Sequence, residues 1–437
     1  MDDISEKEYL SREELEQLQL ERLQQILVRV HRRVAYYRNL FNEIGFDPTT
    51  VSSIEDLKKI PFTTKETLRK AYPYEMFAVP LREVVRMHST SGTTGKPIVV
   101  GYTKNDIIHW SELTARVLMA AGITKEDIIQ ICFPYGMFTG GLGFHYGAEK
   151  LGASVIPSSN AEVEHQILIM RDYHTTVIIC APTFGALIAD SIEKMNITPA
   201  ELVLKTGLFG AEPWSEKLRT KLEENLQIKA FDNYGLTEIM GPGVSYECEH
   251  KSGLHISEDH FIPEIIDPET GDVLPPGQKG ELVLTTLTKE GFPLIRYRTG
   301  DLTTIYPDNC KCGRSFVRMA RVFERIDDMI ILNGQNLFPS QFEQLLTDIF
   351  GHLPGFQLVI DRREDVDELE IQVELSGELF SDEMKKLNEL REEIIFETKR
   401  RLDIVPKVKL VEPETIKKGM KRKKVTDLRE NKNNSQT

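Results

Sequence analysis

The stretch Ser89-Thr-Ser-Gly-Thr-Thr-Gly-Lys-Pro97 is rich in glycine and hydroxyl groups and leads directly into the apolar run IVVGYT at 98–103. Glycines let the backbone approach an anion and turn its N–H groups toward it, while the hydroxyls add donors and Lys96 adds a positive charge. A Walker loop needs G-x-x-x-x-G-K-[ST] followed by a helix, whereas a proline and a strand follow this lysine. The segment predicts a phosphate-binding loop of another kind, with a flexible surface loop as the plain alternative.

Around this loop, from about residue 98 to 285, short β-branched runs alternate with longer amphipathic segments at 105–121 and 161–173. The runs include DIIQICF, ASVIP, TTVIICA and ELVLTTL. This alternation is typical of an α/β architecture with mixed sheets. Further toward the beginning of the chain, 11–44 carries apolar residues at helical spacing and predicts one amphipathic helix.

After residue 326 the pattern starts again and predicts a smaller α+β domain. MIILNG is followed by a helix near 339–350, the strands FQLVID and ELEIQVEL, and a charged helix near 381–401. A chain of 437 residues exceeds the usual size of one hydrophobic core. We therefore expect a large domain at 1–326 and a small domain at 327–437.

The composition excludes several classes of protein. The formal net charge of −14 argues against a nucleic-acid surface. The first fifteen residues are charged where a secretory signal needs an apolar core, and no run approaches the roughly 18 apolar residues of a membrane span. Five unevenly placed cysteines suit reduced thiols or a metal better than a disulfide framework. We expect a cytoplasmic protein that binds small anionic molecules, not nucleic acid or membranes.

A second motif, Phe231-Asp-Asn-Tyr-Gly-Leu-Thr-Glu238, combines an aromatic ring, a hydroxyl and a carboxylate. Tyrosine stacks on purines, threonine donates to phosphates, and glutamate holds Mg²⁺ against phosphate oxygens. A third motif, Arg296-Tyr-Arg-Thr-Gly-Asp301, offers a carboxylate to the two hydroxyls of a ribose. An ordinary turn and a salt-bridged hairpin are the respective alternatives.

The order of these elements resembles the acyl-adenylate-forming superfamily and, within it, the phenylacetate-CoA ligases. The narrower resemblance is carried by STSGTTGKPIVVGYT, YGMFTGGLGFHYGAEKLGASVIP, GAEPWSE and DDMIILNGQNLFPSQFE. It implies an adenylate-forming fold with a mobile C-terminal domain, and an AMP-forming acid-thiol ligase that uses ATP, Mg²⁺ and coenzyme A. It further implies a role in phenylacetate catabolism and a homodimer.

The resemblance also assigns nucleotide-binding residues. The phosphate loop is Ser91, Gly92, Thr93, Thr94, Gly95 and Lys96, and the remaining nucleotide contacts are Ala211, Glu212, Pro213, Asp232, Asn233, Tyr234, Asp301 and Arg325. Thr237 and Glu238 serve phosphate and Mg²⁺ as catalytic residues, and Asp327 is the hinge. The family has glycine before the arginine where this chain has Glu324, which is a departure from the pattern.

The catalytic lysine of the resemblance falls in the basic run KKGMKRKK at 417–424. Counting back from Asp427-Leu-Arg429, which resembles the family's tail, selects Lys421, with Lys418 and Lys423 as alternatives. The family's downstream arginine then corresponds to Lys424. A solvated basic tail is the plain alternative.

An aryl acid needs apolar and aromatic walls around its flat ring. The residues expected to supply them are Tyr135, Phe138, Gly141, Phe144, Ile239 and Pro242. Ordinary core packing is the alternative for any one of them. The following segment, Ser158-Ser-Asn-Ala-Glu162, lacks the glycine that is common in the family, a departure that bears on which acid is preferred.

Four potential metal ligands stand apart from these motifs. Cys248 and His255 share a short segment, and Cys310-Lys-Cys-Gly-Arg314 brings two thiols together at Cys310 and Cys312. Three sulfurs and one imidazole complete a tetrahedral set for zinc and leave no open position, so the expected Zn²⁺ is structural. His250 and His260 compete with His255 for the fourth position.

The expected reaction has two steps. The carboxylate attacks the α-phosphorus of ATP to give acyl-AMP and pyrophosphate, and the thiol of coenzyme A then displaces AMP. One rival is an adenylating enzyme that loads an aryl acid onto a carrier protein. Another is a nucleotide-binding protein without catalysis, against which the intact Thr237, Glu238 and Asp301 count.

Overall fold

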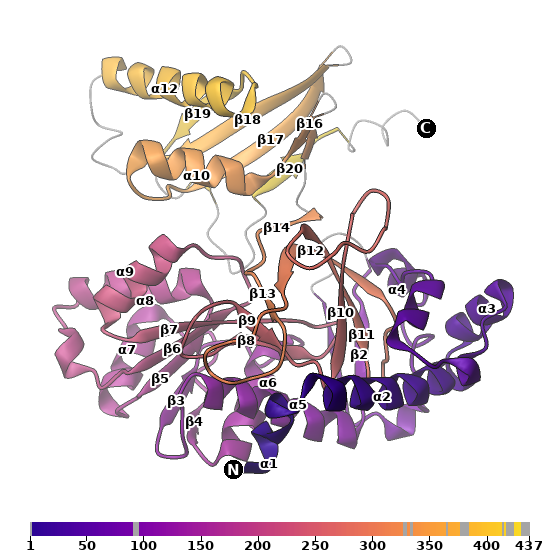
Figure 1. The fold of residues 1–437 in the computed structure, drawn as a ribbon. Coiled ribbons are helices and arrows are strands. Elements are labelled where there is room, and N and C mark those ends of the chain that lie inside the picture. The colour runs from indigo at the N-terminus through magenta and orange to yellow at the C-terminus, as the bar shows by residue number, and fades with distance from the viewer. Residues whose placement is uncertain are drawn as a thin grey trace. The chain divides into compact units, whose positions relative to one another are not determined.

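The computed structural model describes residues 2–90, 96–326, 330–332, 335–363, 366–375, 384–412, 415–416 and 424–429. The chain divides into two compact units, Met1–Phe323 and Glu324–Thr437 (Figure 1). The boundary expected after residue 326 lies close to this division and stays a prediction.

The first unit is built on one long mixed sheet. Its strands run in the order β10-β11-β12-β13-β9-β8-β7-β6-β5-β3-β4. The parallel half contains β3 (Ile128–Ile131), β4 (Ser154–Ile156), β5 (Val177–Cys180), β6 (Thr206–Gly210) and β7 (Lys229–Leu236). The antiparallel half contains β8 (Gly241–Glu247), β9 (Leu254–Ile256), β10 (Phe261–Ile266), β11 (Lys279–Thr286), β12 (Tyr297–Tyr306) and β13 (Arg318–Met319). The α/β class with mixed pairing is confirmed.

Helices cover both faces of the parallel half (Figure 1). In β5, Val177 and Ile179 pack in a core with α5 (Lys104–Ala120) and α6 (Thr139–Leu151). Alternate residues Ile178 and Cys180 pack in a second core with α7 (Val163–Asp172), α8 (Pro182–Lys194) and α9 (Glu216–Leu226). Because successive strand side chains point to opposite faces, a run that is apolar throughout fits a strand buried on both sides.

The structure has two helices where one was expected over 11–44, so the prediction of a single continuous helix is wrong. They are α2 (Arg12–Arg33), which begins with a capping box at Ser11, and α3 (Ala35–Ile44). Val34 between them is extended, with φ −108° and ψ 114°, and is fully buried. Tyr37 and Phe41 of α3 pack in the same core as Leu23, Leu27 and Val30 of α2.

Shorter elements complete this unit. They are α1 (Asp2–Ser5), η1 (Glu6–Tyr9), η2 (Pro48–Thr50), η3 (Ile54–Lys59), α4 (Lys65–Lys70), η4 (Leu81–Glu83), η5 (Pro199–Glu201) and the hairpin of β1 (Arg86–Ser89) with β2 (Val99–Tyr102).

The second unit has an α+β fold. Its sheet runs in the order β19-β18-β17-β20. Its elements are β14 (Glu324–Arg325), β15 (Ile330–Leu332), β16 (Gln335–Leu337), α10 (Pro339–Phe350), β17 (Phe356–Arg363), β18 (Val366–Glu374), α12 (Met384–Leu402), β19 (Lys407–Val411) and β20 (Val425–Asp427). Phe342 and Leu345 of α10 and Ile394 of α12 pack with strand residues such as Ile371 in one core. A separate small α+β unit is thus confirmed.

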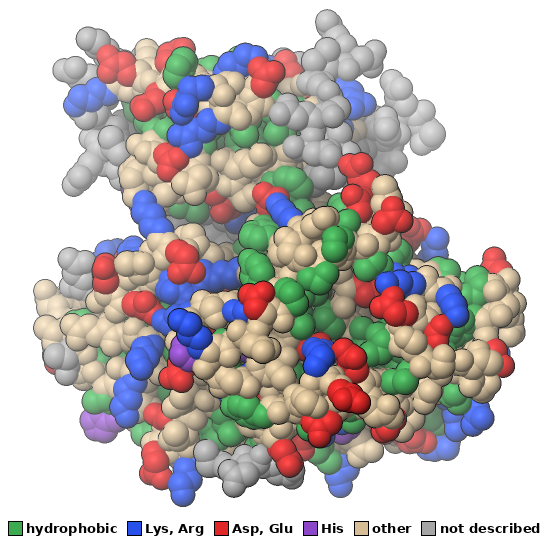
Figure 2. All heavy atoms as spheres, viewed as in Figure 1, with side chains coloured by type: hydrophobic (Ala, Val, Ile, Leu, Met, Phe, Trp, Pro, Cys, Tyr) green, Lys and Arg blue, Asp and Glu red, His purple; other side chains and the backbone are tan. Residues whose placement is uncertain are grey.

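Charge is interspersed over the face of the first unit that Figure 2 draws. On the face drawn in Figure 2, acidic and basic side chains alternate, so the net charge of −14 is not gathered in one acidic patch there. Among the described helices, none combines the length and apolar character needed to span a bilayer.

Candidate active site and metal centre

The segments predicted to hold a purine lie together at the carboxyl ends of two adjacent parallel strands. Gly210, the last residue of β6, pairs with Asn233 of β7. The Asn233 side chain donates to the carbonyl of Phe209 at 2.8 Å and so ties the two strands together. Ala211, directly after β6, has φ 72°, a conformation that non-glycine residues rarely adopt and that clusters at functional sites. Ligands of open α/β sheets bind at this edge.

Two carboxylates predicted in this region also have structural partners. Glu212 accepts a hydrogen bond from the backbone N–H of Thr183 at 2.8 Å, in the first turn of α8. Asp232 is buried and pairs with Arg321, with 3.1 Å between Oδ2 and Nε. Both interactions brace the edge of the sheet.

The residues predicted for adenine and ribose contact each other. The hydroxyl of Tyr234, near the end of β7, donates to Oδ2 of Asp301 on β12 at 2.6 Å. A short hydrogen bond to a carboxylate is a strong one and fixes both side chains. The ring and the carboxylate are therefore held in one place although 67 positions separate them in the sequence.

The predicted phosphate and Mg²⁺ residues follow β7 in a buried turn. Thr237 and Glu238 are 7% and 8% exposed. The hydroxyl of Thr237 lies 3.4 Å from that of Thr139, the first residue of α6. The turn after β7 and the beginning of α6 therefore meet. A buried carboxylate of this kind fits the oxygen donors that Mg²⁺ prefers.

The described ends of the glycine-rich loop are held together at its base. The backbone N–H of Thr90 donates to the carbonyl of Ile98 at 3.0 Å, and the Thr90 hydroxyl accepts from the N–H of Ile98 at 3.0 Å. Ser89 N–H donates to the carbonyl of Met137 at 3.2 Å, beside the predicted acid-binding segment. Lys96 is exposed, with its ammonium 5.6 Å from the centre of the Tyr72 ring. Five predicted loop residues lie outside the described residues: Ser91, Gly92, Thr93, Thr94 and Gly95.

The residues predicted to line an acid pocket differ in burial. Tyr135 and Phe138 are half-buried, and the Tyr135 hydroxyl bonds Nδ1 of His145 at 3.2 Å. Phe144 is 1% exposed and belongs to the core under α5 and α6. Ile239 is fully buried as well. Both side chains are enclosed by neighbouring residues, and their assignment to the acid pocket stays a prediction.

The same segments converge on an aromatic side chain that sequence reasoning missed. The indole of Trp110, in α5, lies against Gly143 of α6 and against Gly241 and Pro242, where the turn after Glu238 enters β8. Its only signal in the sequence is an aromatic residue at helical spacing, which usually indicates ordinary core packing.

The remaining predicted nucleotide residues belong to the second unit. Arg325 forms β14 with Glu324. The hinge Asp327 and the catalytic Lys421, with its alternatives Lys418 and Lys423, lie outside the described residues.

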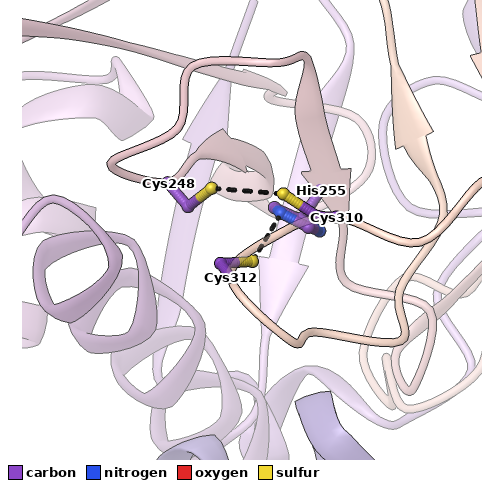
Figure 3. Close-up of side chains that lie close together, drawn as sticks. All are labelled: Cys248, His255, Cys310 and Cys312. Carbon is purple, nitrogen blue, oxygen red and sulfur yellow. Dashed lines mark hydrogen bonds between the residues drawn. The ribbon is translucent and has the colours of Figure 1, made fainter.

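The four predicted metal ligands come together from three separate segments (Figure 3). Cys248 follows β8, His255 lies on β9, and Cys310 and Cys312 lie in the loop between β12 and β13. Their ligand atoms are all within 4.8 Å of one another.

The spacing of these donors suits a tetrahedral metal. Sγ of Cys248 and Sγ of Cys310 are 3.7 Å apart, and Sγ of Cys312 is 3.4 Å from Nε2 of His255. Sulfurs bound to one zinc at about 2.3 Å would be about 3.8 Å apart. Nδ1 of His255 bonds the carbonyl of Phe316 at 3.2 Å, which leaves Nε2 with its lone pair toward the thiols. Burial lowers the pKa of His255 to about 4, so its imidazole is neutral, as a ligand requires.

The alternative His260 is engaged elsewhere. Its Nδ1 bonds the Thr288 hydroxyl at 2.6 Å, and its Nε2 lies 3.3 Å from Asp259. Among the described residues, His250 is not part of the cluster of donors.

The loop that carries two of the thiols also holds the segment near residue 8. Arg314 donates to the fully buried carboxylate of Glu8 at 2.6 Å, and Tyr246 donates to the same oxygen. Both the backbone N–H and the hydroxyl of Ser315 donate to the Glu8 carbonyl, at 2.8 and 3.0 Å. We call residues 310–315 the clasp loop, because they fix η1 to the sheet.

Fold and site together define a class of protein: adenylate-forming enzymes, with nucleotide motifs at one sheet edge and a separate α+β unit. Residues 18–287 match the family model described as AMP-binding enzyme, and 334–429 match that of the AMP-binding enzyme C-terminal domain.

The relatives narrow this class. The chain is 45% identical to phenylacetate-coenzyme A ligase of Thermus thermophilus over 97% of this chain and 99% of that one. It is 49% identical to phenylacetate-coenzyme A ligase of Pseudomonas putida over 83% and 82% of the two chains. A crystal structure of 2-hydroxyisobutyryl-CoA ligase in the postadenylation state superposes with a TM-score of 0.86 at 27% identity, over 98% of this chain and 93% of that one. The chain belongs to the phenylacetate-CoA ligase family of AMP-binding enzymes, as its motifs predicted.

Proposed function

We propose that this enzyme joins phenylacetate, or a closely related aryl acid, to coenzyme A through an acyl-adenylate, with ATP converted to AMP and pyrophosphate. The observation that carries the proposal is the 45% identity to a phenylacetate-coenzyme A ligase along the length of both chains. The contact of Tyr234 with Asp301 and the junction of Thr237 with Thr139 support a nucleotide and phosphate site at one sheet edge.

In the first step a carboxylate oxygen of the acid attacks the α-phosphorus, and the bond to pyrophosphate breaks. The chain's part is to bind and orient the reactants: Tyr234 and Asp301 hold the nucleoside, and Thr237 donates to phosphate. Glu238 would hold Mg²⁺, which supplies positive charge against the phosphate oxygens. Lys421 would add charge at the α-phosphate.

In the second step the sulfur of coenzyme A attacks the acyl carbon, the thiol proton is lost and AMP leaves. We propose that the small unit turns about Asp327 between the steps, which withdraws Lys421 and admits the thiol. Domain rotation in which a few hinge residues absorb the backbone change is a known kind of conformational step in enzymes.

The test is a panel of phenylacetate, benzoate and ring-substituted relatives with ATP and coenzyme A, with products identified by mass. We expect phenylacetyl-CoA together with AMP and pyrophosphate. Acid-dependent pyrophosphate release without a thioester would favour transfer to a carrier protein, and nucleotide binding without pyrophosphate release would favour a protein without catalysis.

We also propose that Cys248, His255, Cys310 and Cys312 hold one structural Zn²⁺, because their donors fit a tetrahedral ion without an open position. A homodimer in the cytoplasm is the expected setting, which light scattering and fractionation would test.

A further inference from the structure

Three buried side chains form a stack behind the turn that follows Glu238. The indole of Trp110 lies parallel to the ring of Tyr102, with 5.0 Å between centroids and 21° between planes. The amine of Lys289 lies 3.2 Å from the centre of the Tyr102 ring on which it rests. All three are 1% exposed or less. They come from α5, β2 and the segment after β11 (Figure 1).

Each member of the stack binds the same turn. The Tyr102 hydroxyl donates to the carbonyl of Met240 at 2.9 Å. The indole N–H of Trp110 donates to the carbonyl of Pro242 at 3.0 Å. Lys289 donates to Sδ of Met240 at 3.5 Å. Because buried carbonyls need donors, these contacts set the backbone position of the turn.

The indole also fixes the distance to the facing helix. A Cβ on Gly143 of α6 would lie 2.6 Å from Cζ2 of Trp110 and 2.7 Å from Cγ of Pro242. A Cβ on Gly241 would lie 2.7 Å from the same indole atom. Thr114, one turn of α5 beyond Trp110, donates to the carbonyl of Gly143 at 2.8 Å. Gly143 of α6 and residues 241–242 therefore meet at the same edge of the indole.

We propose that Tyr102 and Trp110 are positioning residues for acid selectivity. They set the separation of the two segments expected to enclose the aryl ring, 138–144 and 239–242, without touching the substrate. This inference rests on the proposed function, since it takes those segments as the acid site. A pocket discriminates one methylene by roughly 10- to 200-fold, so a small shift of one wall changes which acid is preferred.

The first test is Tyr102→Phe, which keeps the ring and removes the bond to Met240. We expect KM for the acid to rise about fivefold or more, as the loss of one hydrogen bond predicts. We expect KM for ATP to stay within about twofold and the ratio of kcat/KM for phenylacetate over benzoate to change.

The matched control is Tyr37→Phe. Tyr37 is another fully buried tyrosine, and its hydroxyl bonds Thr63 at 3.0 Å and the N–H of Ile295 at 2.9 Å. This variant should lose stability and leave both KM values unchanged. If Tyr37→Phe reproduces the kinetic effect, or if Tyr102→Phe shifts acid and ATP KM in parallel, the positioning role is wrong.

The two tryptophans of the chain allow an independent readout. In Trp214→Phe, Trp110 is the only indole, and its emission should change as acid is added. The added Tyr102→Phe substitution should move the midpoint by the same factor as acid KM. If the emission of Trp110 does not change when acid is added, the inference is wrong. The proposed function has its own test: it is wrong if the unaltered enzyme forms no aryl thioester in the acid panel.

Discussion

At the scale of single residues, Tyr234 and Asp301 show how two separate motifs become one site. Each was predicted to bind the nucleoside, but nothing in the sequence predicts the 2.6 Å bond between them. Such a contact depends on how β7 and β12 are placed across the sheet. The sequence identifies the two side chains, and the order of the strands in the sheet determines the distance between them.

Asp301→Asn should therefore weaken nucleotide binding. The charged acceptor for the ribose hydroxyls is lost, so we expect KM for ATP to rise about tenfold or more while acid KM changes little. Steady-state kinetics with each substrate varied will measure this. Tyr234→Phe, which keeps the carboxylate, should have a smaller effect on KM for ATP. An unchanged ATP KM in Asp301→Asn would contradict the assignment.

Lys289 is a second residue whose behaviour follows from its surroundings. Burial lowers its pKa to about 7, against the opposing attraction of Asp106. Between pH 7 and about 10.5 the unfolded chain binds a proton that the folded chain does not, so stability rises with pH in that window. Below pH 7 the cost of the buried charge is present in full.

Lys289→Met should remove this cost. We expect a gain on the order of 2 kcal/mol in unfolding free energy at pH 7, because the lost contacts to Tyr102 and Met240 offset part of the benefit. Urea unfolding at pH 7, 8 and 9 will measure it, and the gain should shrink as pH rises. Lys125→Met, at a lysine with 66% side-chain exposure, should show no such trend. If both variants show the same pH trend in unfolding free energy, the lowered pKa of Lys289 is contradicted.

The sequence does not signal that Lys289 or Glu8 is buried. Both stand in polar stretches, TLTKEG and SEKEY, where a charged residue usually predicts the surface. Their charged partners are distant in the sequence: Asp106 attracts the lysine, and Arg314 donates to the glutamate.

At the scale of elements, two glycines of helix α6 differ in how closely neighbouring side chains approach them. A Cβ on Gly143 would meet Trp110 and Pro242 at under 3.0 Å, whereas the atoms nearest to a Cβ on Gly140 belong to Phe133, at 3.4 Å or more. The sequence GGLG at 140–143 does not show which glycine is needed for close packing.

Gly143→Ala should destabilise the fold by about 1–3 kcal/mol through overpacking and should raise acid KM. Gly140→Ala lies in the same helix and should be neutral or stabilising by up to about 1 kcal/mol, since alanine favours helix. Thermal unfolding and acid KM will be measured for both. If the two variants behave alike, the close packing at Gly143 is not decisive.

The clasp loop is a second element with a testable role. Cys312→Ser should reduce bound zinc well below one ion per chain and loosen the hold of the loop on η1. Metal analysis and limited proteolysis near residue 8 will measure the two effects. Cys180→Ser, at a buried cysteine of β5 outside the cluster, should retain the zinc. Zinc retention in Cys312→Ser would contradict the assigned ligand set.

Prediction of elements from sequence succeeded where periodicity was strong and failed at a local break. The segments 105–121 and 161–173 correspond to α5 and α7 within a few residues. The run 11–44 keeps its helical spacing through Val34, so no breaker signals the extended residue there. After the break, Tyr37 and Phe41 pack in the same core as α2.

At the scale of the whole molecule, the residues proposed for the two-step reaction lie in both units. The first unit brings together the described nucleotide motifs of β7 and β12, and the second contains the tail with Lys421. The restart of the hydrophobic pattern after residue 326 was enough to predict a separate unit. The tail lysine was selected only by counting from Asp427, because a basic run has no periodicity that distinguishes one member.

Lys421→Ala should separate the two steps. We expect acid-dependent pyrophosphate release to fall about 10²- to 10³-fold, the usual cost of losing one preorganised donor. Thioester formation from supplied acyl-adenylate should be nearly unchanged. Lys418→Ala and Lys423→Ala are the matched controls in the same basic run. Equal losses in both half-reactions, or the same selective loss in a control, would reject the role of Lys421.

The clasp loop also has a consequence for biosynthesis. Glu8 leaves the ribosome before its partners Tyr246 and Arg314, which follow 238 and 306 positions later in the chain. At a translation rate of roughly 5–20 residues per second, the carboxylate waits roughly 15–60 s for its guanidinium partner. The segment around Glu8 is thus made long before it can be enclosed, and the nascent chain remains open to chaperones and proteases at that point until the clasp loop has emerged.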